Sequence, residues 1–183
     1  MKQDRILIVV DMQKDFIDGS LGTAEAEAIV PAAVEKIRRA AAEGIPVIAT
    51  LDTHGPDYLS TREGRFLPVL HCVEGSEGWQ LDPRIAEALG NSARLPKPSF
   101  GSMELPALVR ELTGAVGDGK GLCIELIGLC TDICVVSNAM ILKAAFPEAD
   151  FAVDAACCAG VTPEKHLAAL ETMRSCQIVI ENP

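Results

Sequence analysis

A short, wholly apolar segment that ends in a carboxylate places the tightest limit on this fold. Residues 6–10 read Ile-Leu-Ile-Val-Val, and Asp11 follows them directly. A run that is apolar at every position and rich in β-branched residues predicts a strand buried on both faces, because a half-exposed strand would alternate apolar and polar side chains. The segment therefore favours a parallel sheet that is covered by helices on both sides.

The rest of the chain alternates between predicted strands and helices. Apolar spacing predicts helices over residues 25–43, 83–89, 104–112, 131–146 and 163–175 and strands over residues 46–51, 92–95, 122–127, 151–154 and 177–180. This alternation predicts an α/β fold with three layers, α/β/α, around a central and mainly parallel sheet. The 183 residues contain no repeat and no linker of domain length, so we expect a single domain over residues 1–183.

Composition and charge exclude several classes of protein. A chain that is 49% hydrophobic and 23% charged is not a disordered one. The net charge of −10 argues against binding to nucleic acid or to an anionic membrane, since both need clustered cations. The seven cysteines are odd in number and lie mostly in apolar runs, which predicts reduced thiols and a cytoplasmic protein. The apolar run near the N-terminus is too short for an export signal or a membrane span.

Chemistry-bearing residues stand where the predicted strands end. Asp11, Asp52 and Lys97 follow three strands, and Cys134 comes shortly after a fourth. In open parallel sheets the ligand site lies beyond the carboxyl ends of the strands. A thiol in the first turn of a helix has its pKa lowered by the helix dipole, and free backbone N–H groups there can hold an oxyanion. The alternative for Cys134 is a small buried apolar residue.

A cysteine nucleophile needs a base, and the strand ends offer one. Asp11 can take the thiol proton and return it to a leaving amine, while Lys97 stabilises the thiolate. The alternatives are a strand-end cap for Asp11 and a solvated loop charge for Lys97. His166 belongs to an amphipathic helix, so we expect it to have a surface or packing role.

The stretch over residues 53–83 has no regular period, and a loop of that length is usually functional. It begins at Asp52-Thr53-His54 and contains His71. Two histidines and a carboxylate suit Zn²⁺, Fe²⁺ or Mn²⁺ and leave coordination positions open, and Glu63 is a further carboxylate within reach along the chain. The alternative is a loop that happens to hold two of the three histidines.

Several segments together resemble the nicotinamidase/isochorismatase-like cysteine hydrolases. Residues 128–135, Gly-Leu-Cys-Thr-Asp-Ile-Cys-Val, resemble the family's nucleophile motif, which is the most specific of these matches. The other matching segments are residues 8–16, 19–21, 51–54, 71–73 and 75–78, together with Lys97, Ser99 and Phe100. The resemblance implies the isochorismatase-like fold with Rossmann-type topology. It also implies an Asp11–Lys97–Cys134 triad, an oxyanion hole from the Ile133 and Cys134 amides, and a cis peptide between Leu129 and Cys130.

The resemblance also implies a substrate and a metal site. Asp52, His54 and His71 match the nicotinamidase metal ligands, which isochorismatases proper lack; Glu63 matches a fourth ligand, with Asp57 as its alternative. In the resembling enzymes the metal binds the pyridine nitrogen, so the implied reaction is nicotinamide to nicotinate and ammonia through a thioester. The implied enzyme is a homo-oligomer acting on a small-molecule amide. Candidates for clamping the ring are Phe16, Phe66 and Phe100, with Trp79 less well placed.

Departures from the family pattern leave other functions open. The stretch before His71 lacks the usual aromatic close to that histidine, and Pro68 stands three residues away instead of directly before it. The alternatives are another amidase or ureido-hydrolase of the family, a vinyl-ether hydrolase of the isochorismatase kind, and a non-catalytic module that binds a metal or a thiol.

Overall fold

The centre of the molecule is a six-stranded sheet in which every neighbouring pair of strands is parallel. The computed structural model describes residues 4–183, so the first three residues of the segment considered for an export signal lie outside it. The strand order is β3-β2-β1-β4-β5-β6, the order of a doubly wound Rossmann-type sheet. The strands are β1 (Arg5–Val10), β2 (Val47–Asp52), β3 (Ala93–Lys97), β4 (Cys123–Leu129), β5 (Asp150–Ala159) and β6 (Val179–Glu181).

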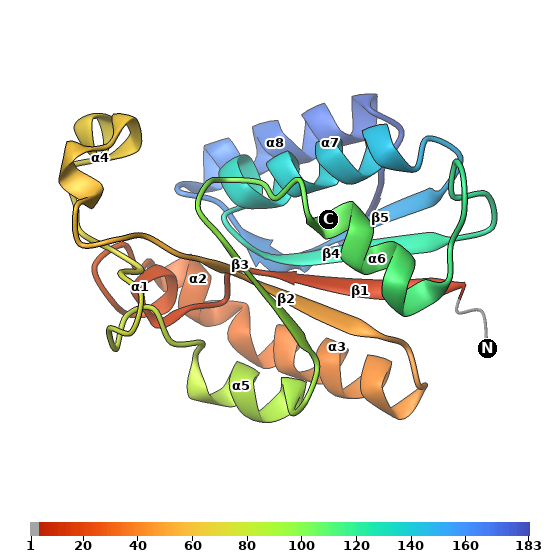
Figure 1. Cartoon of the computed structure of the whole chain (residues 1–183), viewed down its shortest axis with the longest axis horizontal. Helices are drawn as coiled ribbons and strands as arrows, with labels where there is room; N and C mark the ends of the chain where they lie inside the picture. Colours follow the sequence, from red (N-terminus) through yellow and green to blue (C-terminus); the bar gives the residue numbers. More distant parts are fainter. Residues whose placement is uncertain (1–3) are drawn as a thin grey trace.

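Helices cover both faces of the sheet, which confirms the predicted three-layer arrangement. In Figure 1, α3 and α5 lie on one face, and α6, α7 and α8 lie on the other. Two short helices, α1 and α4, stand beyond the carboxyl-terminal edge of the sheet. The helices are α1 (Lys14–Ile17), α2 (Ala24–Ala28), α3 (Val30–Ala42), α4 (Arg62–Phe66), α5 (Pro83–Leu89), α6 (Leu105–Thr113), α7 (Val136–Ala145) and α8 (Pro163–Ser175), with short turns η1 (Tyr58–Ser60) and η2 (Thr131–Val135).

Several predicted elements differ in detail from the structure; the strand predicted over residues 151–154, for example, extends over Asp150–Ala159. The helix predicted over residues 25–43 is two helices, because Pro31 occupies the first turn of α3, where the missing N–H costs nothing, and a new helix starts there. The irregular stretch over residues 53–83 contains η1 and α4, the latter capped by the Thr61 hydroxyl, which accepts a hydrogen bond from Gly64 N. This short capped helix orients the side chains of the predicted metal loop.

The contact between β1 and β4 brings the two central strand ends together. Val10 pairs with Gly128, where the register of β4 against β5 shifts. Gly128 has φ +118°, and a Cβ there would lie 2.2 Å from the Val10 carbonyl oxygen. Only glycine allows this approach. It places Asp11, the residue after β1, beside the turn that leads to Cys134.

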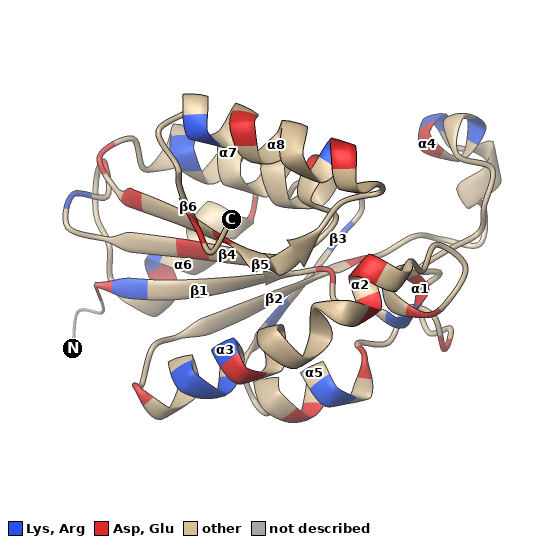
Figure 2. Cartoon of the chain, turned by 180° about the vertical axis from the view of Figure 1, so that it is seen from behind, with Lys and Arg blue, Asp and Glu red and all other residues tan. Residues whose placement is uncertain are grey.

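The remaining general predictions concern charge, thiols and membranes. Each of the seven cysteines is free. Figure 2 shows basic and acidic residues interspersed along the helices of the face in view, and the absence of nucleic-acid binding stays a prediction. Over residues 4–183 there is no helix with the length and apolar character that crossing a bilayer requires.

Candidate active site

Three side chains from three different strand ends meet at the carboxyl-terminal edge of the sheet. Lys97 Nζ lies 2.7 Å from Asp11 Oδ2 and 3.6 Å from Cys134 Sγ. Asp11 and Lys97 are completely buried, and Cys134 is 5% exposed. The structure therefore brings the predicted carboxylate, cation and thiol into one contact group, as their positions after β1, in β3 and after β4 suggested.

The two oxygens of Asp11 have different partners. Oδ1 accepts a hydrogen bond from the Thr50 hydroxyl at 2.6 Å. Oδ2 is close to Lys97 but receives no hydrogen bond of good geometry from the residues that the structure describes. Burial raises the pKa of Asp11, and the Lys97 charge opposes that rise. Thr50 thus holds one oxygen in place, and the other remains able to accept a proton.

Burial is the largest influence on the pKa of the Cys134 thiol. Burial raises this pKa well above its usual value, the Asp11 charge adds to the rise, and Lys97 lowers the pKa by a smaller amount. The direction is opposite to the one expected from the helix terminus alone.

Lys97 links this group to a second cluster. Its ammonium also lies 3.3 Å from Asp52 Oδ1 and donates to the Ser99 carbonyl at 3.0 Å. Burial lowers the pKa of Lys97, but Asp11, Cys134 and Asp52 together raise it above its usual value. The Lys97 nitrogen therefore lies close to two carboxylates and one sulfur.

The turn that carries Cys134 differs from the predicted helix start. Residues Thr131–Val135 form one turn of π-helix, and Cys130 is its N-cap, without a side-chain hydrogen bond. Neither Thr131 nor Asp132 caps the helix, because both side chains reach toward α8: Thr131 Oγ1 is 2.8 Å from His166 Nδ1, and Asp132 Oδ1 accepts from Val161 N. His166 is thus joined to the nucleophile turn, which its amphipathic setting did not predict.

One of the two amides predicted for an oxyanion hole is already engaged, because Ile133 N donates to the Cys130 carbonyl at 3.1 Å. The peptide bond between Leu129 and Cys130 is cis. The oxyanion hole stays a prediction, in which Ile133 takes part only by sharing its N–H.

A second cluster, formed by four side chains, lies beside Asp11, Lys97 and Cys134. Asp52, His54, Glu63 and His71 each offer one ligand atom, and these atoms all lie within 4.8 Å of one another. His54 Nε2 and His71 Nε2 are 2.8 and 3.5 Å from Asp52 Oδ2. The same two nitrogens are 3.6 and 3.9 Å from Glu63 Oε1. Four ligands at about 2.0–2.2 Å from a tetrahedral metal stand about 3.3–3.6 Å apart, so these separations suit a divalent ion.

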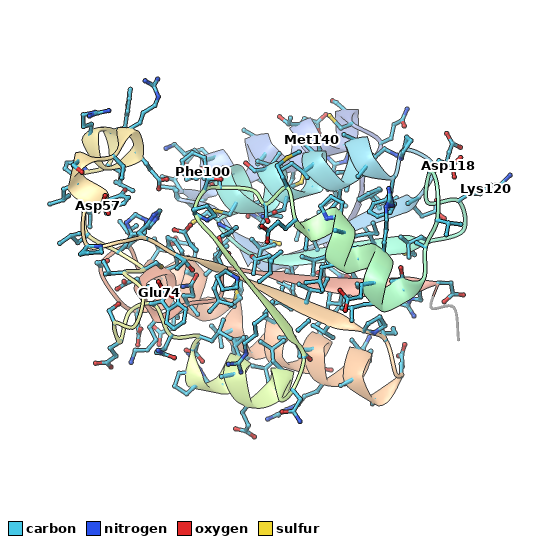
Figure 3. The ribbon with its side chains drawn as sticks, in the orientation of Figure 1. Asp57, Glu74, Phe100, Asp118, Lys120 and Met140 are labelled. Carbon is cyan, nitrogen blue, oxygen red and sulfur yellow. The ribbon has the colours of Figure 1, made fainter. Side chains whose placement is uncertain are left out.

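The hydrogen bonds of the histidines agree with a ligand role. His71 Nδ1 lies 2.8 Å from the Val69 carbonyl, which assigns the proton to Nδ1 and leaves the lone pair of Nε2 free. His54 Nε2 is buried without a hydrogen bond of good geometry within residues 4–183. Asp57, the alternative fourth ligand, is exposed and lies outside the group, on the loop labelled in Figure 3. The donor set Asp52, His54, Glu63 and His71 therefore fits a divalent cation.

A cavity of about 720 Å³ opens from both groups. Asp52, Glu63, His71 and Cys134 lie in its wall, whereas His54 does not, so the cavity joins the thiol to three of the four cluster residues. The three phenylalanines predicted to hold a ring, Phe16, Phe66 and Phe100, also line it. Trp79 does not; its indole N–H donates to Thr53 Oγ1 instead.

Comparison with known proteins decides the family. The isochorismatase domain model matches residues 5–182. The chain belongs to the isochorismatase family. Among curated protein sequences none matches the chain.

Solved structures resemble this isochorismatase-family hydrolase over nearly their full length. Nicotinamidase from Bacillus subtilis superposes with a TM-score of 0.83 at 23% identity, covering 98% of this chain and 100% of that one. A zinc complex of pyrazinamidase from Pyrococcus horikoshii gives 0.75 at 28% identity, covering 97% and 98%. N-carbamoylsarcosine amidase from Thermoplasma acidophilum gives 0.78 at 26% identity, covering 99% and 96%.

Several supporting residues of the isochorismatase-family site were missed from the sequence. The Gln13 side chain accepts from Asp52 N at 2.7 Å and donates to Asp52 O at 2.9 Å, which fixes the backbone of the proposed ligand. The Tyr58 ring packs against His54 and His71, with centroids 4.5 and 4.8 Å away. For Gln13 the sequence offered one indication, its position two residues after Asp11. For Tyr58 it offered none, because the contacts of Tyr58 depend on how the loop folds.

Proposed function

We propose that this chain is a cysteine amidohydrolase that hydrolyses a carboxamide on a nitrogen heterocycle, with nicotinamide as the model substrate. The observation that carries the proposal is the position of Lys97 Nζ, 2.7 Å from Asp11 Oδ2 and 3.6 Å from Cys134 Sγ. A carboxylate, a cation and a thiol in contact, buried at the end of a cavity, form the set that acyl transfer to sulfur needs. The likeness to nicotinamidases and to an amidase supports an amide as the bond that is cleaved.

The first half of the reaction makes a thioester. Asp11 takes the proton of Cys134 as the sulfur attacks the amide carbon, and Lys97 stabilises the negative charge that passes between them. The Cys134 amide donates to the oxyanion. Asp11 then gives the proton to the leaving nitrogen, the C–N bond breaks and ammonia departs.

The second half restores the thiol. A water molecule attacks the thioester carbon while Asp11 accepts one of its protons. The C–S bond breaks, the acid product leaves and Asp11 returns the proton to Cys134. Because Asp11 alternates between accepting and donating, a pKa raised by burial suits it better than that of an exposed aspartate.

The four-residue cluster would orient the substrate ring in the site. A divalent metal, Zn²⁺, Fe²⁺ or Mn²⁺, held by Asp52, His54, Glu63 and His71 would supply a Lewis-acidic position for a ring nitrogen. The Phe16 ring centroid is 5.6 Å from that of His71, so Phe16 would contact the heterocyclic ring of a substrate held beside the cluster. Lys97 joins the two halves of the site through its contacts with Asp11 and Asp52.

Ammonia release tests the proposal. Purified protein is assayed with nicotinamide, pyrazinamide, benzamide and an N-carbamoyl amino acid, before and after treatment with a chelator and after adding back one metal at a time. We expect turnover of the two ring-nitrogen amides that falls with chelation, and little turnover of benzamide, which has no ring nitrogen. Preferred turnover of the N-carbamoyl amino acid would instead assign the ureido-hydrolase activity that the amidase likeness also favours. Turnover of none of them, with no selective alkylation of Cys134, would indicate a non-catalytic module.

A further inference from the structure

The cavity continues well beyond the groups that the proposed reaction uses. A volume of about 720 Å³ lies in the range that encloses drug-sized ligands, whereas nicotinamide is a single ring with one carboxamide. The polar groups that touch the reacting atoms, Cys134 and the metal cluster, occupy one part of its wall. From the remaining wall the proposed chemistry uses only Phe16, which lies beside the cluster.

That remaining wall is mainly apolar and partly exposed to water, with Thr23, Arg62 and Lys165 as its polar members. We call Phe66, Leu67, Phe100 and Val161 the outer wall; all four line the cavity. Their exposed fractions are 78%, 37%, 45% and 41%. Apolar side chains gathered around a cavity mouth are a usual sign of a binding surface, in contrast to single apolar residues scattered over a protein.

The outer wall is built from three separate segments. Phe66 ends α4 and Leu67 follows it, Phe100 lies shortly after β3, and Val161 precedes α8. Figure 1 shows α4 standing off the body of the molecule, and Figure 3 shows Phe100 at the same edge of the sheet. Because these segments are far apart in the sequence, the outer wall forms only when the chain folds.

The α4 side of the wall is held in place. The Tyr58 hydroxyl donates to the Leu67 carbonyl at 3.0 Å, and Tyr58 itself is fully buried. Glu63 and Phe66 are three residues apart on α4, so the helix backbone sets Phe66 at a defined distance from the metal cluster, and the Arg62 guanidinium lies 5.2 Å from the centroid of its ring. A ligand held at that cluster is thereby set at a defined place along the outer wall.

We propose that the preferred substrate is larger than nicotinamide: a heterocyclic carboxamide that carries an apolar arm, which the outer wall binds. This inference rests on the proposed function and names its substrate class. A small amide leaves the outer wall in water, whereas an apolar arm removes that surface from water and gains binding energy in proportion to the area covered. The arm contacts the wall equally before and during the chemical step, so its effect belongs in KM more than in kcat.

A series of 5-alkyl and 6-alkyl nicotinamides, from methyl to hexyl, tests the proposal against parent nicotinamide. In at least one series kcat/KM rises by about threefold to fourfold per methylene until the arm leaves the wall. Phe66→Ala flattens that rise, because it removes the most exposed apolar side chain of the outer wall. Leu59→Ala is the matched control, because Leu59 is 48% exposed in η1 but does not line the cavity.

The outcomes separate this inference from the proposed function. If nicotinamide is hydrolysed and kcat/KM is flat or falls along both alkyl series, the apolar arm is wrong and the amidohydrolase stands. If neither nicotinamide nor its alkyl derivatives are hydrolysed, binding of the same series to the Cys134→Ala variant is measured by calorimetry. Affinity that does not increase with arm length there overturns the outer-wall proposal as well. An unchanged slope in Phe66→Ala together with a smaller mass by light scattering would assign the wall to a second copy of the chain and also overturn it.

Discussion

Lys97 Nζ lies 2.7 Å from Asp11 Oδ2, and both side chains are completely buried. Removing one partner of a buried ion pair destabilises the folded protein, because the remaining charge is left poorly solvated in the interior. Asp52 Oδ1, 3.3 Å from the same nitrogen, adds to that cost. The pair therefore contributes to folding as well as to the proposed chemistry, and the two contributions can be measured separately.

Removing the cation gives the first prediction. Lys97→Met is expected to lower the free energy of unfolding at pH 7 by about 3–5 kcal/mol and to abolish amide hydrolysis. The double variant Asp11→Asn/Lys97→Met recovers much of the stability, since one buried charge no longer lacks a partner, but recovers no activity. Urea unfolding followed by circular dichroism measures the first effect and ammonia release the second. An active double variant would contradict the role of the pair.

The metal cluster gives the second prediction. His71→Ala is expected to weaken Zn²⁺ binding by at least about a hundredfold, because it removes a ligand whose Nε2 is free for the ion. Glu63→Gln weakens binding less, since an amide oxygen remains. Asp57→Asn is the control and leaves binding unchanged, because Asp57 lies outside the cluster. Calorimetry on chelator-treated protein measures all three, and equal affinities for His71→Ala and Asp57→Asn would refute this ligand set.

The contact between Thr131 and His166 gives the third prediction. His166 Nδ1 lies 2.8 Å from Thr131 Oγ1 at the start of the turn that carries Cys134. His166→Ala is expected to lower kcat about tenfold with little change in KM, because a small displacement of a nucleophile slows the reaction strongly. Leu167→Ala, an exposed change on the same helix, is the control. A loss confined to thermal stability, with kcat retained, would mean that His166 serves folding alone.

A charge cluster on the α3 side of the sheet gives the fourth prediction, on pH. Lys36 forms ion pairs with Glu125, Asp154 and Glu181. Burial raises the pKa of Asp154, but hydrogen bonds from Lys36 and Asn182 together lower that pKa by more than burial raises it. The net shift of the pKa is therefore downward. A folded-state pKa below the unfolded one adds stability above the ordinary aspartate pKa, and that stability is lost as pH falls through the folded value.

Lys36→Met tests this linkage. The variant is expected to unfold about 3 kcal/mol more easily at pH 7, and the difference from the parent chain shrinks below about pH 4 as the carboxylates become protonated in both. Lys120→Met is the control, because Lys120 is an exposed lysine, labelled in Figure 3, whose ammonium forms no ion pair within residues 4–183; only its backbone N–H contacts an acid, Asp118. A difference that is constant from pH 7 to pH 3 would show that Lys36 acts through packing and not through charge.

Much of the site was predictable because parallel strands end at one edge of a sheet. Asp11, Asp52 and Lys97 each follow or end a strand, so their meeting needed only the fold class. The choice of Glu63 over Asp57 was not predictable from spacing, since it depends on α4, a one-turn helix inside a stretch without apolar period. The partnership of Thr131 with His166 joins segments far apart in the chain, and no local pattern announces it.

The pKa of Cys134 was not predictable from its neighbours in the sequence. Position at a helix start predicts a lowered pKa, whereas burial raises the pKa because a thiolate loses solvation in the interior. Burial of one side chain is a property of the whole packed domain and cannot be read from the residues around it. The raised pKa agrees with the role expected for Asp11 from its position, which is to accept the thiol proton during the reaction.

The most direct test of the account is ammonia release from nicotinamide by Cys134→Ala, with Cys176→Ala as the matched control among the cysteines. The account predicts a loss of at least about a thousandfold in Cys134→Ala, with unchanged circular dichroism and unchanged Zn²⁺ affinity, and full activity in Cys176→Ala. Retention of more than about a tenth of the parent rate by a folded Cys134→Ala protein would contradict the central claim that this sulfur attacks the amide.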